Sequence, residues 1–153
     1  MTAQMHQTVL QKSLLLAMRL LVGWLFLRAG LRQLFSGEWT AANLLGGAQN
    51  LKFVFDFMMQ PPLLNIIDTI VPLVHLVLAL SFILGIFVSL AGAVGATLMM
   101  LYFLPVVQFS WSPPPAITNE HIVYALIMLY LASVDAGRVW GLQTVIDKLR
   151  SRR

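Results

Sequence analysis

Long apolar runs separated by short polar segments dominate the chain. One run covers residues 13–35, a second continues almost unbroken from 63 to 107, and a third covers 120–139. As one helix, the second run would be about 67 Å long, more than twice the ~30 Å hydrocarbon core of a bilayer. It therefore has to fold back once, and we expect the turn at Gly85–Ser89.

These runs predict an all-α fold, in which one integral membrane four-helix bundle comprises the whole chain. The predicted spans are 13–35, 63–85, 88–107 and 120–139. The polar segment after the first span favours short helices in the first outer loop. After Trp140, apolar residues recur on one helical face and basic residues lie elsewhere, which predicts a short amphipathic helix on the membrane surface.

Composition supports the membrane class. Of the 153 residues, 59% are hydrophobic and only 10% are charged, whereas about a quarter of the residues of a soluble domain are charged. The chain contains no cysteine, which excludes disulfides, cysteine-ligated iron–sulfur clusters and thiol–disulfide relays.

The distribution of basic residues predicts the orientation. Lys12 precedes the first span, Arg138 lies at the end of the fourth and four basic residues follow it, whereas Lys52 is the basic residue of the opposite loops. The positive-inside rule therefore places both termini in the cytoplasm. We interpret the net charge of +4 as an orientation signal and expect no nucleic-acid partner.

Small residues on the third span predict close helix packing. Ala91 and Gly95, and likewise Gly92 and Ala96, are four positions apart and so share a helical face. Such faces let two backbones approach each other closely. We expect this face to pack within the bundle and not against a second copy.

Ionisable residues inside the spans point to a candidate site. With the predicted topology, seven polar side chains fall in the outer half of the bundle, with His75 two turns deeper than Asp68. The outer seven are Arg28, Arg32, Asp68, Tyr102, Glu120, His121 and Tyr124. Ionisable groups at such depths usually face a bundle interior or a wet cavity.

Two interpretations of this cluster stay open. In the first, it lines an electropositive pocket that receives an anion or a quinone headgroup, with Arg28, Glu120 and His121 as catalytic residues. Arg32, Asp68, His75, Tyr102 and Tyr124 would then help to bind the substrate. In the second, Arg28 and Glu120 form a structural ion pair and Arg32 extends to the interface.

Two further pairs of ionisable residues have spacings that suggest a role. His75 and His121 could in principle ligate a haem iron, but they fall at different depths, so we expect neither haem nor another metal. Asp135 and Arg138 are three residues apart and are expected to form a local ion pair near the inner interface.

The segments RLLVGWLFLRAGLRQLFSGEW and EHIVYALIMLYLASVDAGRVWGL resemble the DoxX/DoxD family of small four-helix membrane proteins, and most closely its DoxD branch. The resemblance implies a subunit that oxidises thiosulfate to tetrathionate and passes electrons to quinone. It also implies a second small subunit and the plasma membrane of a prokaryote.

Other functions remain open. The chain could be a non-catalytic accessory or assembly subunit of a larger respiratory complex, because other DoxX/DoxD members are associated with such complexes. A small transporter is a third possibility, but that class would favour a carboxylate in the first span, where this chain has arginines.

Overall fold

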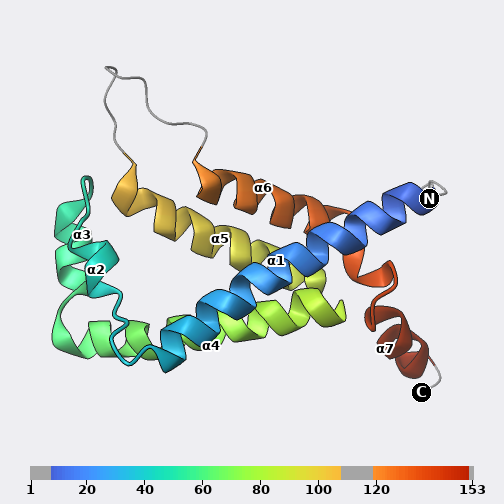
Figure 1. Cartoon of the computed structure of the whole chain (residues 1–153), viewed down its shortest axis with the longest axis horizontal. Helices are drawn as coiled ribbons and strands as arrows, with labels where there is room; N and C mark the ends of the chain where they lie inside the picture. The colour runs from blue at the N-terminus through green and yellow to red at the C-terminus, as the bar shows by residue number, and fades with distance from the viewer. Residues whose placement is uncertain (1–7, 108–118, 152–153) are drawn as a thin grey trace.

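A computed structural model describes residues 8–107 and 119–151, and every regular element in them is helical (Figure 1). Three helices are long and apolar enough to cross a membrane: α1 (Val9–Phe35), α4 (Pro61–Leu84) and α5 (Val88–Val106). A fourth apolar helix, α6 (Glu120–Ser133), is shorter. The all-helical expectation is thus confirmed.

Short elements fill the connections. Helices α2 (Ala42–Leu45) and α3 (Lys52–Met58) follow α1, as expected for this loop, and they enclose a small apolar cluster around Leu45 and Phe55. After α6 come one 3₁₀ turn, η1 (Ala136–Arg138), and helix α7 (Gln143–Arg150). The predicted short helix in the tail is therefore present.

Local sequence signals set the helix ends. Thr8 and Gln11 form a capping box at the start of α1, and the prolines 61 and 62 open α4, where a missing amide hydrogen has no cost. Gly85 ends α4 in a left-handed conformation with φ of 69°, which glycine adopts readily. The predicted turn between the second and third spans is confirmed.

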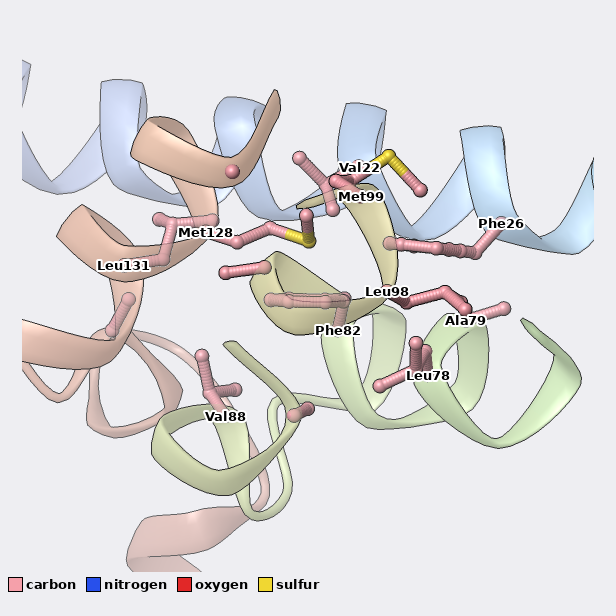
Figure 2. Packing of buried hydrophobic residues seen from close by; sticks show 14 of the residues in the cluster. Val22, Phe26, Leu78, Ala79, Phe82, Val88, Leu98, Met99, Met128 and Leu131 are labelled. Carbon is pink, nitrogen blue, oxygen red and sulfur yellow. The ribbon is translucent and has the colours of Figure 1, made fainter. Parts of the chain in front are cut away.

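The four apolar helices share one core. Helix α1 packs mainly on α4, and α5 packs mainly on α6. Figure 2 shows Phe26, Phe82 and Met128, from α1, α4 and α6, meeting in this core beside Met99 of α5. The start of α1 lies at the same end of the molecule as α7, and α2 and α3 lie at the other end (Figure 1).

The small residues of α5 allow α6 to approach closely. A methyl group built on Gly92 would lie 2.6 Å from the carbonyl oxygen of Met128, and one on Gly95 would lie 2.6 Å from the sulfur of Met128. Both glycines are buried. This confirms that the small-residue face packs inside the molecule.

Helix α6 ends at Ser133, six residues before the predicted end of the fourth span. Asp135 adopts a left-handed conformation with φ of 48°, and the 3₁₀ turn follows. The chain then docks on the α4–α5 turn, where the amide groups of Leu142 and Gln143 donate to the carbonyls of Leu84 and Gly85. These tertiary hydrogen bonds explain why the apolar pattern up to Val139 does not continue as helix.

Arg19 holds this docked segment to α1. Its side chain is 1% exposed, and its Nη1 donates to the carbonyls of Ala136 (2.9 Å) and Val139 (3.0 Å). Its Nη2 donates to the carbonyl of Trp140 (3.4 Å). Within the described segments no carboxylate pairs with it. Carbonyl oxygens of the 3₁₀ turn and of the two residues after it thus solvate the guanidinium charge.

The expected ion pair between Asp135 and Arg138 does not form in the described residues. Asp135 accepts a hydrogen bond from the hydroxyl of Ser89 (2.8 Å), and Arg138 pairs with Asp147 of α7 (3.2 Å). The prediction was wrong because helix α6 stops before this segment, so the two residues are not on one α-helical face.

Candidate functional site

A row of aromatic and imidazole rings crosses the interior. We call His75 of α4, Tyr102 of α5 and His121 of α6 the ring row. The rings of His75 and Tyr102 stack with centroids 5.8 Å apart, and the Tyr102 ring meets the His121 ring edge-on at 6.2 Å. Three helices thus bring together three of the residues predicted for the candidate site.

His75 is the buried end of the ring row. It is 2% exposed, and its ring lies 5.5 Å from that of Phe26. Its Nε2 is 3.3 Å from the hydroxyl of Tyr102. Its Nδ1 lies towards the Val71 carbonyl but forms no hydrogen bond with good geometry among the described residues. A buried imidazole with one free nitrogen is an uncommon arrangement that points to a role beyond packing.

Gln33, near the end of α1, brings a second incompletely paired group to the ring row. Its side chain lies beside Tyr102. Its Oε1 is buried and lacks a hydrogen-bond partner in the part of the chain that the structure describes. Unpaired buried polar atoms are costly, so Gln33 and His75 together favour a site for a polar ligand or water.

A cleft of about 350 Å³ opens on the other side of Gln33, between α1, the loop after it and α4. Its lining includes Gln33, Trp39, Asp68 and Pro72, with leucines from both helices. Ligand pockets in proteins typically have volumes of about 300–1,000 Å³ and combine apolar walls with a few polar groups. The cleft therefore has the size and lining of a small-ligand site.

Asp68 shapes the cleft wall. Its carboxylate accepts hydrogen bonds from the hydroxyl of Thr40 and from the amide of Ala41, both at 2.7 Å. These bonds tie the loop after α1 to the first turns of α4. Asp68 thus lies at the expected end of the molecule, but its partners are loop groups and not the arginines of α1.

His121 is positioned by its own helix end. Asn119 caps α6 and accepts from the His121 amide at 2.9 Å, and its Oδ1 lies 2.6 Å from the imidazole Nδ1. Asn119 thus fixes the orientation of the ring that meets Tyr102.

The remaining predicted site residues are not part of the ring row, although Glu120 is the chain neighbour of His121. Arg28, Arg32 and Glu120 are exposed, and none of them forms an ion pair with a described residue. Tyr124 is half-buried and packs against the main core. The alternative structural ion pair between Arg28 and Glu120 is therefore not present in the described segments. The roles assigned to these residues stay predictions.

Sequence reasoning overlooked Gln33, Trp39 and Asn119. A signal for Gln33 was available, because the buried residues of α1 follow a helical stripe through Phe26 and Gly30 that continues to Gln33. Arg28 and Arg32 lie off that stripe. The charge of a residue does not tell whether it faces the interior or the surface, whereas its position in the helical period does.

The ring row and the cleft together favour proton transfer to a ligand. Tyrosine and histidine can both give and take protons, and an amide can orient a carbonyl oxygen. Among residues 8–107 and 119–151, no group of three histidine or acidic side chains gathers in a way that could hold a metal ion.

Comparisons of the chain with protein-family models, with curated proteins and with solved structures found no match.

Proposed function

We propose that this chain is a membrane subunit of a quinone-linked oxidoreductase, with thiosulfate as the electron donor and tetrathionate as the product. In this proposal α1, α4, α5 and α6 form a four-helix bundle in a prokaryotic plasma membrane. The start of α1 and the basic helix α7 face the cytoplasm, and a second small subunit takes part. The sequence resemblance to the DoxX/DoxD family supports the choice of reaction.

The observation that carries the proposal is the adjacency of the cleft and the ring row. Gln33 lines the cleft and also lies beside Tyr102, which in turn approaches His75 at 3.3 Å. A quinone headgroup in the cleft would have Trp39 as an aromatic wall and Gln33 as a donor to one carbonyl. The unpaired buried Oε1 of Gln33 is an acceptor and would suit the hydroxyl of the quinol product.

The reaction balances without a residue of this chain being consumed. Two thiosulfate anions lose one electron each and join through a new sulfur–sulfur bond. The quinone takes up the two electrons and two protons to become quinol. Tyr102 does not itself line the cleft, so in this scheme its proton reaches the quinone through a water molecule beside Gln33. Tyr102 is then reprotonated from His75 or His121, which both contact its ring, and the two protons come in the end from the medium.

We expect Tyr102→Phe to lower the rate of quinone reduction by thiosulfate about 100-fold, because a positioned proton donor typically contributes a factor of 10²–10⁴. The phenylalanine ring keeps the contacts with both imidazoles, so the fold should be retained. The measurement is quinol formation by the purified chain with its partner subunit in proteoliposomes.

Tyr130→Phe is the matched control, because Tyr130 is an exposed tyrosine of α6 and should keep the full rate. Full activity in Tyr102→Phe would show that the ring row is not the site. A complex of wild-type chain and partner that cannot pass electrons from thiosulfate to quinone would remove the proposed reaction itself.

A non-catalytic accessory subunit is the second candidate, and one observation favours it. Trp24, Arg28 and Arg32 are all exposed on α1. Arginines on a membrane helix are costly where they face lipid, whereas a partner subunit could cover them. For this role we expect Arg28→Ala to reduce co-purification of the partner, whereas Tyr102→Phe would leave it unchanged.

A further inference from the structure

A second cavity lies at the α7 end of the molecule, and no residue of the ring row lines it. Its volume is about 230 Å³, and it lies between the start of α5, the 3₁₀ turn η1 and the start of α7. This volume is below the ~300 Å³ at which most small-molecule pockets begin. The cavity therefore suits one polar headgroup better than a whole metabolite.

Two opposite charges line this cavity without pairing with each other. Asp135 and Arg138 both contribute to the wall, with Asp135 in a left-handed conformation just before the 3₁₀ turn and Arg138 at its end. The turn is closed by the Arg138 amide, which donates to the Asp135 carbonyl at 2.9 Å. Even so, the ion pair that Arg138 makes is with Asp147.

Asp135 and Arg138 each have atoms that form no hydrogen bond with a described residue. The Asp135 Oδ1 accepts from Ser89, whereas its Oδ2 has no partner in the described residues. Arg138 uses its Nε for Asp147, whose other oxygen accepts from Gln143 at 2.9 Å. This leaves the two terminal nitrogens of Arg138 without a described partner. The cavity thus offers an anionic acceptor and a two-nitrogen donor next to each other.

The wall of the cavity also has an apolar side. Phe87 and Leu90, at the start of α5, are 50% and 66% exposed, and both line the cavity. Helix α7, with exposed Leu142, Val145 and Leu149 and basic residues in its last turn, is suited to lie at a membrane surface. A ligand here would meet charge at one end and lipid-like surroundings at the other.

We infer that this cavity binds the headgroup of a phospholipid that carries a primary ammonium, as phosphatidylethanolamine does. The ammonium hydrogens would bond to the Asp135 carboxylate, and the phosphate would accept from the terminal nitrogens of Arg138. The acyl chains would run along Phe87 and Leu90. Phosphatidylcholine cannot donate such hydrogen bonds, and phosphatidylglycerol has no cation for Asp135.

The test is lipid binding to the purified, delipidated full chain, measured by native mass spectrometry and by the thermal shift on lipid addition. We expect phosphatidylethanolamine to bind at least about 10-fold more tightly than phosphatidylcholine or phosphatidylglycerol of the same acyl chains. Asp135→Asn should abolish this preference, because a charge-assisted hydrogen bond is then lost.

Three control variants separate binding from folding. Ser89→Ala removes the hydrogen bond to Asp135 but keeps the carboxylate, and Asp147→Asn releases Arg138 but keeps both cavity charges; both should retain the preference. Lys148→Gln changes an exposed basic residue of α7 and should also retain it. Equal binding of the three lipids to the wild-type chain, or an undiminished preference in Asp135→Asn, would overturn the proposal.

Discussion

Replacing Arg19 with alanine is expected to lower the free energy of unfolding by about 3 kcal/mol, because one buried and two partly buried carbonyl groups lose their donor at once. The carbonyls are those of Ala136, Val139 and Trp140. The truncated side chain also leaves a cavity between α1 and the docked segment, which adds to the loss. Chemical unfolding in mixed micelles, followed by tryptophan fluorescence, measures the effect.

Arg32→Ala is the matched control, because Arg32 is an exposed arginine of the same helix. Its change should stay within about 0.5 kcal/mol, as is usual for surface positions. Arg19→Lys keeps the charge but replaces a planar fork by a single ammonium, so we expect a loss between those of the other two variants. Equal losses in Arg19→Ala and Arg32→Ala would contradict the carbonyl-clamp role of Arg19.

Gly92→Ala is expected to destabilise the chain by about 1–3 kcal/mol, the usual range for overpacking in a tight interior. The added methyl group would lie 2.6 Å from the Met128 carbonyl oxygen and 2.8 Å from the Ala132 side chain. A backbone carbonyl cannot move aside alone, so α5 and α6 have to separate. The same unfolding experiment applies.

Two neighbouring positions serve as controls for Gly92. At Gly95 the added methyl group would meet the sulfur of Met128, which lies near the end of a flexible side chain and can move, so Gly95→Ala should cost less. Ala93 is exposed, and Ala93→Leu should be nearly neutral. An order of loss in which Gly95→Ala exceeds Gly92→Ala would show that the α5–α6 distance is not set at Gly92.

The helices could be predicted well because the signals for them are local. The apolar runs, the two prolines that open α4 and the glycine at position 85 indicate the three long helices to within a few residues. The end of α6 could not be predicted in this way. It depends on hydrogen bonds from Leu142 and Gln143 to the α4–α5 turn and on Arg19, and these contacts join residues far apart in the sequence.

The candidate site was predicted in part. His75, Tyr102 and His121 do meet, because α4, α5 and α6 present them to the same part of the interior. The arginines mislead because charge alone does not tell which side of a helix a residue occupies. Arg19 and Gln33 lie on the buried stripe of α1, and Arg28 and Arg32 do not. Applying the helical period to polar residues as well as apolar ones would have separated the two pairs.

In the proposed membrane arrangement, the early end of α6 affects the surrounding bilayer. At ~1.5 Å per residue, its 14 residues extend only about 21 Å, whereas α1, α4 and α5 are long enough for the full hydrocarbon thickness. Hydrophobic mismatch on one side of a protein is relieved by local thinning of the membrane or by tilting. The face that carries α6 should therefore draw the two leaflets together and collect shorter-chain lipids around the molecule.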